Sequence, residues 1–322
     1  MLGLIPRFRV TALWLCLWLA TSFLAPAAAD PVFARVKRGL APVTLAPNQE
    51  SELVTQALLW EKVEVLERKG DWTKVYVCDQ YRTKRGYPGW VKTEVLEFSP
   101  VAPGKDWLVV TEPWVALRQQ PTTEAAMVGQ AYFSARLPVD WPEALHTGRE
   151  AITRDQRDKG WFPTKLPGGG KAWVRADQVD RPSVPAARSG RSLVEQAELF
   201  LETPYLWGGM SKSGIDCSGL TFVVYQRNGV TIPRDADQQF QVGVAVTPEE
   251  LQVGDLVFFG ESDADITHVG MYAGEGNIIH ASSGSGVVVS ELFQGWYKQM
   301  YRGARRILNS RSGGTRVLTP AP

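Results

Sequence analysis

Three cysteines and three histidines occur in the chain, and one cysteine is placed for nucleophilic chemistry. Cys217 stands where a helix is expected to begin, because the apolar run of residues 220–228 follows it and ends at Gly229. Unpaired N–H groups and the macrodipole at a helix N-terminus lower the pKa of a thiol there. The sequence therefore predicts an activated nucleophile, and the alternative is a small buried cysteine that only packs.

Two of the three histidines, His268 and His280, flank a glycine-rich turn. The segments on either side are short, β-branched and aromatic, which predicts a β-hairpin. If Ala273 lies opposite Asn277, then Gly270 lies opposite His280 and His268 is a diagonal neighbour on the same face. The pattern therefore brings the two imidazoles together.

These residues match the nucleophile, base and orienter of a cysteine hydrolase. In this interpretation Cys217 attacks a carbonyl, His268 takes and returns the proton, and His280 fixes the tautomer of His268. The alternative for His280 is a strand histidine with a satisfied hydrogen bond. The backbone N–H groups of Cys217 and Tyr205 are candidate donors to the oxyanion.

The motifs around these residues resemble the NlpC-type cell-wall peptidases, which are papain-like cysteine hydrolases. The resemblance covers about residues 190–308 and rests on five elements in order, which are residues 205–209, 216–219, 254–256, 268–270 and 279–281. It implies an α+β papain-like domain that hydrolyses peptide bonds in bacterial peptidoglycan stems, with Cys217, His268 and His280 as the catalytic set. It also implies that no metal or other cofactor is needed.

Length and composition are those of a globular protein with several domains. The chain has 322 residues, of which 44% are hydrophobic and 21% are charged, and its formal net charge is +1. Because no basic stripe accompanies this balance, we expect no nucleic-acid partner.

The first residues have the pattern of a signal peptide. Arg7 and Arg9 precede an apolar run over residues 10–24, and the small residues 27–29 suit cleavage. We therefore expect export to the periplasm or to the cell wall and extracellular space. A retained membrane anchor is the alternative, since the apolar run is nearly long enough to span a bilayer.

Removal of the signal would leave two cysteines in an oxidising compartment, which raises the question of a disulfide. Cys78 ends a strand-like run in a different domain from Cys217. We expect Cys78 to be a buried structural thiol, because pairing would remove the nucleophile.

The region between signal and peptidase repeats itself. Residues 54–58 are echoed by 128–132, and residues 90–95 by 173–179. Each copy contains short β-branched runs separated by turn residues, which predicts small β-barrels. The first copy resembles bacterial SH3-like domains, and the second is more divergent, with an insertion at residues 146–160.

The expected architecture is two small all-β SH3-like barrels followed by an α+β papain-like domain. Its first helix should start at Ser192, with Glu195 completing a capping box. The expected boundaries are a signal peptide at 1–29, SH3-like domains at 30–102 and 103–180, a linker at 181–190, the peptidase domain at 191–308 and a disordered tail at 309–322.

A closer resemblance concerns the substrate. Together with this domain order, residues 86–90 and 232–238 are similar to those of γ-D-glutamyl-L-diamino acid endopeptidases. The resemblance implies that Tyr87, from the first barrel, closes one end of the cleft. There Asp235 would pair with the ammonium of a free N-terminal L-Ala, and Ser218 and Tyr205 would line the same pocket.

The role implied for Asp235 agrees with physical chemistry, because an ammonium in a partly buried pocket needs a carboxylate partner. Glu52 is a possible second carboxylate there. The alternatives are a helix cap or a salt bridge with Arg234 for Asp235, and ordinary barrel packing for Tyr87.

The sequence therefore predicts an exported cysteine peptidase that cuts the γ-D-Glu to diamino acid bond of stem peptides or muropeptides through an acyl-enzyme on Cys217. One alternative is a D,L-endopeptidase acting on intact cell wall. The other is a catalytically inert wall-binding protein.

Overall fold

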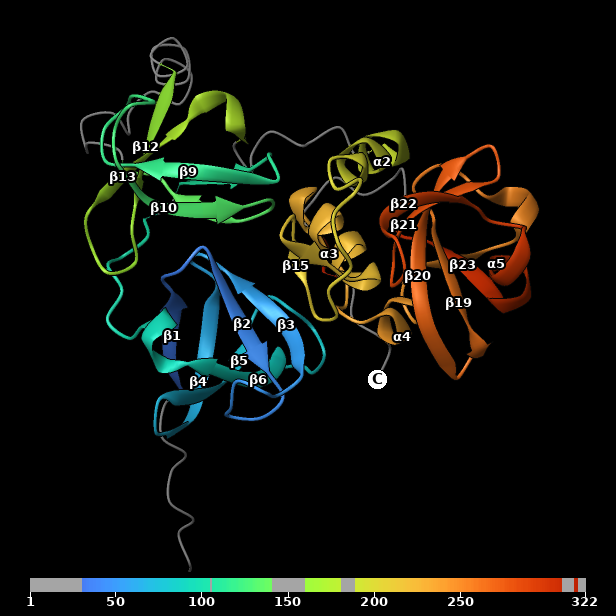
Figure 1. Ribbon diagram of the computed structural model, residues 1–322, viewed down its shortest axis with the longest axis horizontal. Coiled ribbons are helices and arrows are strands. Elements are labelled where there is room, and N and C mark those ends of the chain that lie inside the picture. Colours follow the sequence, from blue (N-terminus) through green and yellow to red (C-terminus); the bar gives the residue numbers. More distant parts are fainter. Residues whose placement is uncertain (1–30, 105, 141–159, 181–188, 309–315, 318–322) are drawn as a thin grey trace, which may run out of the picture. The chain divides into compact units, whose positions relative to one another are not determined.

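The computed structural model describes residues 31–104, 106–140, 160–180, 189–308 and 316–317 (Figure 1). The expected signal peptide at 1–29 lies outside the described residues, as do most of the predicted insertion and most of the tail. Among the described residues, no helix is both long and apolar enough to cross a membrane.

The first β unit is a seven-stranded antiparallel sheet in the order β3-β2-β6-β5-β4-β1-β7. Along β5 the valines alternate inward with polar residues that face out, as a half-buried strand requires, and Val75 and Val77 are fully buried, as is Val63 on β4. The strands are β1 (Val32–Val36), β2 (Leu40–Thr44), β3 (Leu53–Leu58), β4 (Lys62–Lys69), β5 (Trp72–Val77), β6 (Tyr87–Lys92) and β7 (Leu96–Glu97).

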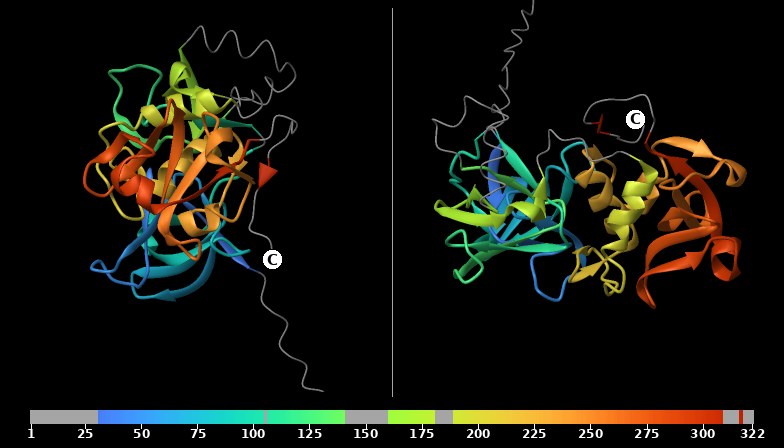
Figure 2. Two further views of the ribbon diagram at one scale, coloured as in Figure 1. Left: turned by 90° about the vertical axis from the view of Figure 1, so that its right-hand side faces the viewer. Right: turned by 90° about the horizontal axis from the view of Figure 1, so that it is seen from above.

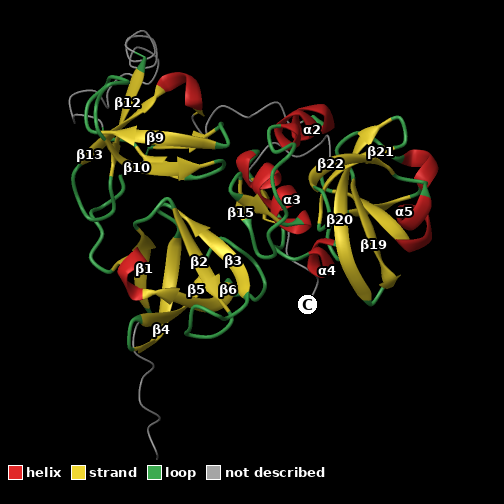
Figure 3. Ribbon diagram, in the orientation of Figure 1, coloured by secondary structure: helices red, strands yellow, loops and turns green. Residues whose placement is uncertain are grey.

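The second β unit has two small antiparallel sheets, in the orders β10-β9-β13-β12 and β11-β8-β14 (Figure 3). Its core includes Trp60 from the end of β3, whose indole stacks edge-on against Trp107 at 6.2 Å. That this unit is a second SH3-like barrel stays a prediction. The strands are β8 (Trp107–Val110), β9 (Trp114–Arg118), β10 (Met127–Tyr132), β11 (Arg136–Pro138), β12 (Trp161–Lys165), β13 (Lys171–Arg175) and β14 (Val179–Asp180).

The third region is built on a six-stranded antiparallel sheet in the order β18-β23-β19-β20-β21-β22. Its helices are α2 (Gly190–Glu198), α3 (Cys217–Arg227), α4 (Ala236–Gln239) and α5 (Gly295–Met300). Its strands are β15 (Met210–Ser211), β16 (Gly214–Ile215), β17 (Val230–Thr231), β18 (Val244–Val246), β19 (Leu256–Ser262), β20 (Asp265–Gly274), β21 (Asn277–Ser282), β22 (Gly286–Glu291), β23 (Tyr301–Arg306) and β24 (Arg316–Val317).

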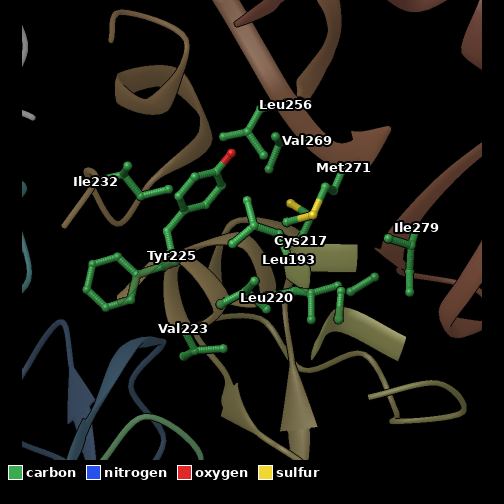
Figure 4. Packing of buried hydrophobic residues seen from close by; sticks show 14 of the residues in the cluster. Leu193, Cys217, Leu220, Val223, Tyr225, Ile232, Leu256, Val269, Met271 and Ile279 are labelled. Atoms are coloured by element: carbon green, nitrogen blue, oxygen red, sulfur yellow. The ribbon is translucent and has the colours of Figure 1, made fainter. Parts of the chain in front are cut away.

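Both faces of this sheet are covered, so β19 is apolar almost throughout. Leu256 and Phe258 face the core that α2 and α3 form against the sheet. Figure 2 shows the helices beside the sheet, and Figure 4 shows side chains of this core. Val257 and Phe259 face the opposite side, where side chains of α5 join them. Packing on the first of these faces holds helix α3, which begins at Cys217, against strand β20, which carries His268.

Helix α2 begins earlier than its sequence indicates. The side chain of Ser189 accepts a hydrogen bond from the backbone N–H of Ser192 at 3.1 Å, so Ser189 is the N-cap and the predicted capping box at Ser192 is wrong. Gly190, expected in the linker, is already helical. Its Cα lies so close to Val253 that an added Cβ would come within 1.5 Å of the Val253 carbonyl oxygen, which explains a glycine in the first turn.

The disordered tail expected at 309–322 stays a prediction, although the structure describes a short strand at two of its positions. Strand β24 (Arg316–Val317) pairs in parallel with β17 (Val230–Thr231). Polar and glycine-rich composition does not prevent a short segment from pairing where a neighbouring edge strand offers free backbone groups.

Candidate active site

The nucleophile candidate occupies the first position of helix α3, as the sequence predicts. Asp216 is the N-cap, and its Oδ1 accepts a hydrogen bond from the backbone N–H of Gly219 at 2.6 Å. A Cβ at Gly219 would come within 2.4 Å of the carbonyl oxygen of Gly209. The helix start therefore packs directly on the loop before β15, and glycine is needed for that approach.

A buried ion pair holds this helix start. The guanidinium of Arg234, only 1% exposed, donates to Asp216 Oδ1 at 3.0 Å and Oδ2 at 2.7 Å. It also donates to the hydroxyl of Ser218 at 3.0 Å and, across to the first β unit, to the hydroxyl of Thr55 at 3.1 Å. The alternative that Arg234 pairs with Asp235 is therefore wrong, since its ion pair is with Asp216. Sequence adjacency suggested the wrong partner.

The hairpin register agrees with the prediction near the histidines and differs at the turn. Met271 lies opposite Ile279, the register that places Gly270 beside His280, and an added Cβ at Gly270 would lie 3.2 Å from the His280 Cβ. Asn277 lies opposite Gly274 rather than Ala273, because a bulge shifts the pairing by one residue.

The two imidazoles are in direct contact. Nε2 of His268 lies 2.9 Å from Nδ1 of His280, and Nε2 of His280 lies 3.0 Å from the hydroxyl of Ser290 on β22. The result is a chain of three side chains from three adjacent strands. The other ring nitrogen of His268, Nδ1, takes no part in this chain. The backbone N–H of Val269, the next residue, donates a hydrogen bond to the Cys217 thiol.

Aromatic rings enclose the histidine pair. Trp296 lies with its ring centroid 6.0 Å from that of His268, and Tyr297 lies 5.1 Å from His280, both from helix α5. Phe259 of β19 lies 5.7 Å from His268. Sequence reasoning missed these residues and Ser290, because only the folded sheet brings them to the hairpin.

The predicted lowering of the Cys217 pKa is wrong for this geometry. Burial of the side chain, together with the nearby Asp216 carboxylate, raises the pKa of the Cys217 thiol to about 12, and hydrogen bonds from the backbone of Val269 and Ser218 offset only part of this. The helix N-terminus stabilises a thiolate, but excluding water from it costs more here. The resting nucleophile is therefore a thiol.

Both histidines are neutral for the same reason. Burial, then the neighbouring His280, lowers the pKa of His268 to about 3, and burial lowers the pKa of His280 to about 4. A neutral His268 can accept a proton from a neutral thiol as attack proceeds. In this arrangement the thiol proton would move to His268 during the reaction.

These shifts predict how stability depends on pH. In the unfolded chain His280 takes up a proton near its ordinary pKa of 6.5, whereas in the fold it stays neutral down to about 4, so stability falls as pH falls through that window. Between about pH 7 and about pH 5 this group alone should lower the free energy of unfolding by on the order of 2 kcal/mol. Urea unfolding at both pH values should show that the free energy of unfolding falls less in His280→Gln than in the wild-type protein. An equal loss in both would contradict the assignment.

A cleft of about 490 Å³ opens beside Cys217. Six of the eight predicted site residues line this cleft. The other two, His268 and His280, are not among its lining residues and contact each other as described above. The six are Glu52, Tyr87, Tyr205, Cys217, Ser218 and Asp235.

Asp235 and Tyr87 both line the cleft and contact each other. The hydroxyl of Tyr87, from β6 of the first β unit, donates to Asp235 Oδ2 at 3.1 Å, with Oδ1 at 3.3 Å. Asp235 stands at the N-cap position of α4 but makes no side-chain capping bond, so the helix-cap alternative fails. Burial raises the pKa of Asp235, and the positive charges of Arg234 and Arg82 act in the opposite direction.

The other predicted residues line the same cleft. Glu52 is exposed and accepts a hydrogen bond from the Trp207 indole N–H at 2.7 Å. Tyr205 is half-buried; burial raises the pKa of its phenol, and the nearby Cys217 adds to this effect. That the backbone N–H groups of Cys217 and Tyr205 bind an oxyanion stays a prediction.

Sequence reasoning also missed a cation in the cleft. Arg82, from the loop between β5 and β6, lies 3.1 Å from Asp235 Oδ2 through its Nη1 atom. The same Nη1 atom donates to both carboxylate oxygens of Asp237 at 2.9 Å. No sequence motif marked this residue, since its partners lie more than 150 positions away.

Cys78 and Cys217 are both free thiols. Cys78 is half-buried, more open than the buried thiol that its strand pattern predicts. Burial, reinforced by Asp79, raises the pKa of its thiol. Within the described ranges, no group of three or more His, Cys, Asp or Glu side chains is arranged to hold a metal ion.

A cysteine at a helix start, bonded to the backbone next to one of two hydrogen-bonded histidines on an antiparallel sheet, matches the residue set of a cysteine hydrolase. The NlpC/P60 family model matches residues 202–306, and the model of the bacterial dipeptidyl-peptidase SH3 domain matches residues 45–96. The chain belongs to the NlpC/P60 family of cysteine peptidases, with an SH3 domain of this kind near its N-terminus.

Two curated relatives match most of the chain. It is 36% identical over 273 residues to a γ-D-glutamyl-L-lysine dipeptidyl-peptidase of Bacillus cereus, covering 80% of this chain and 76% of the relative. It is 29% identical over 262 residues to the protein of the same name in Bacillus subtilis, covering 80% and 82%. A crystal structure of an NlpC/P60 family protein from Bacillus cereus superposes with a TM-score of 0.73 at 29% identity, covering 86% of this chain and 100% of that one.

Proposed function

We propose that this peptidase cuts the bond between γ-D-Glu and a diamino acid in peptidoglycan stem peptides that begin with a free L-Ala. One observation carries the proposal: the hydroxyl of Tyr87, from the first β unit, contacts Asp235 where both residues line the cleft. We infer that this contact closes the cleft at one end. A closed end with a carboxylate suits a short peptide whose chain starts there with an ammonium group. The relatives named as dipeptidyl-peptidases support the same substrate.

The charge of the cleft supports recognition of an amine. Its described lining carries five carboxylates and a single arginine. One of the five, Asp216, is neutralised by Arg234, which leaves an excess of negative charge. The acidic residues are Glu52, Asp216, Asp235, Asp237 and Asp265.

In the proposed reaction the thiol of Cys217 attacks the γ-carbonyl carbon of D-Glu and its proton passes to Nδ1 of His268. For Nδ1 to be free, Nε2 of His268 must carry a hydrogen and donate to Nδ1 of His280, 2.9 Å away. His280 then carries its own hydrogen on Nε2 and donates to the Ser290 hydroxyl at 3.0 Å. The chain of hydrogen bonds thus fixes the tautomer that the base needs.

The steps that follow balance the proton. Collapse of the tetrahedral intermediate breaks the bond to the diamino acid, whose amine leaves with the proton held by His268. The L-Ala-γ-D-Glu acyl group remains as a thioester on Cys217. Water then attacks the thioester and His268 takes the water proton. As the carbon–sulfur bond breaks, His268 passes this proton to the sulfur, which releases the dipeptide and restores the free thiol.

The first test is the choice between free peptide and polymer. We expect L-Ala-γ-D-Glu to be released from the free tripeptides with L-Lys or meso-diaminopimelate, detected by mass spectrometry. Intact sacculi, whose L-Ala is amide-linked to the glycan, should yield at least about 100-fold less product per unit time, since the closed end excludes that linkage and the ammonium is absent.

The two alternative functions predict different results in that assay. A D,L-endopeptidase of the intact wall would cut sacculi at least as fast as the tripeptide. An inert wall-binding protein would cut neither, although the intact Cys217 and histidine pair argue against inertness. For location, the pattern of residues 1–29 and the peptidase family favour the periplasm or the cell wall.

A further inference from the structure

We infer that Thr55, on β3 of the first β unit, is a positioning residue for the nucleophile and acts through Arg234. The buried guanidinium of Arg234 has a protein acceptor for each of its N–H groups. Nη1 and Nη2 donate to residues of the peptidase region, which are Gly209, Asp216 and Ser218. Nε donates to the hydroxyl of Thr55 at 3.1 Å. One donor of this cation therefore depends on a residue of the first β unit.

The contact between Arg234 and Thr55 is closed to solvent. Arg234 is 1% exposed and Thr55 is fully buried. A buried charged donor that loses its acceptor costs more free energy than the hydrogen bond itself contributes. Loss of the Thr55 hydroxyl should therefore move the guanidinium towards another acceptor, and its two bonds to Asp216 would change with it.

Gln80 fixes the direction of the Thr55 hydroxyl. Its side-chain Nε2 donates to the carbonyl of Gln56 at 2.8 Å and to the carboxylate of Glu61 at 3.2 Å, so its Oε1 faces Thr55. The Thr55 hydroxyl donates to this Oε1 at 2.6 Å. Because a hydroxyl has a single hydrogen, this bond leaves an oxygen lone pair to accept from Arg234.

The orientation of Arg234 determines the charge beside Cys217. Asp216 precedes the nucleophile, and its carboxylate forms the buried ion pair with Arg234 at 2.7 Å. Burial raises the pKa of the Cys217 thiol, the Asp216 carboxylate adds to this rise, and the positive charge of Arg234 opposes it. Since the sulfur gains negative charge as it attacks, a guanidinium that moves away from Asp216 should slow the attack.

The role of Thr55 is separate from substrate binding. Thr55 is not among the described residues that line the cleft, so its substitution removes no substrate contact there. The strand that carries it packs directly on the loop before α3, where the side-chain oxygen of Gln56 accepts from the backbone N–H of Met210 at 2.8 Å. Strand β3 thus holds the hydroxyl at a fixed position relative to the start of α3.

The test compares the wild-type protein with Thr55→Val, which removes the hydroxyl and keeps the shape of the side chain. Labelling of Cys217 by iodoacetamide, followed by mass spectrometry, needs no substrate and reports the reactivity of the sulfur. Thr55→Val should lower the rate constant of this labelling by about 10-fold, and kcat on L-Ala-γ-D-Glu-L-Lys by a similar factor with little change in KM. Labelling of Cys78 should be unchanged. Thr55→Ser, which keeps the hydroxyl, should retain most of both rates.

Thr73→Val is the matched control. Thr73 is also fully buried in the first β unit, but its hydroxyl hydrogen-bonds with that of Thr93 in the same unit at 2.9 Å. This variant should keep the wild-type labelling rate, and thermal unfolding of both valine variants measures any loss of stability.

Unchanged or faster labelling of Cys217 in Thr55→Val would overturn the inference, since an interface that is merely loosened exposes the thiol. An equal fall in Thr55→Ser or in Thr73→Val would also overturn it, because the hydroxyl of Thr55 would then not be the cause. Labelling needs no peptide, so failure to cut the tripeptide would overturn the proposed function and leave this inference intact.

Discussion

Cys217→Ala is expected to reduce hydrolysis by at least about 10⁴-fold, because no other group in the site can form the acyl-enzyme. The substitution removes one sulfur atom from an apolar core and should cost the fold only about 1 kcal/mol. The measurement is kcat/KM on L-Ala-γ-D-Glu-L-Lys, with thermal unfolding recorded on the same sample. Cys78→Ala, the matched control for losing a thiol, should retain full activity.

His268→Ala should cause nearly the same loss, and the double variant with Cys217→Ala should be no worse than either alone. Both side chains act on one covalent pathway, so their effects are not additive. Iodoacetamide offers an independent check, since labelling of Cys217 should track loss of activity. Inactivation by labelling of Cys78 alone would contradict the assignment.

Local signals in the sequence predicted the catalytic elements well. Helix α3 (Cys217–Arg227) and the hairpin of β20 and β21 follow from a cap, an apolar run and a glycine turn, all within a few residues. Because strand pairing fixes side-chain faces, the contact between His268 and His280 could also be deduced from register.

Features that depend on long-range contacts could not be predicted in the same way. Arg234 joins Asp216 to Thr55, which is 179 positions away in the first β unit, and Ser290 reaches His280 only after β22 pairs with β21. The ionisation state of Cys217 was beyond sequence reasoning for the same reason. The helix N-terminus is a local feature, but the burial that outweighs it comes from the whole core.

Acetylation of the substrate N-terminus is the second change with a large expected effect. It removes the positive charge that would pair with Asp235 and adds bulk next to the contact between Asp235 and Tyr87. Loss of a charge-assisted hydrogen bond of about 3 kcal/mol corresponds to at least about a 100-fold fall in kcat/KM. Asp235→Asn should slow cleavage of the free peptide by a similar factor.

The same variant should have much less effect on the acetylated peptide, because that substrate has already lost the interaction. Asp265→Asn is the matched control, since Asp265 lines the cleft but is exposed at the start of β20, on a different element from Asp235. It should leave the ratio between free and acetylated peptides close to that of the wild-type protein.

Recognition of a free N-terminal amine at Asp235 is tested most directly by kcat/KM for the four combinations of wild-type or Asp235→Asn protein with free or acetylated L-Ala-γ-D-Glu-L-Lys. We predict one fast combination, wild-type protein with the free peptide, and three slow ones of similar rate. Equal wild-type rates on the free and acetylated peptides would contradict the closed, amine-binding cleft and favour an endopeptidase of the intact wall.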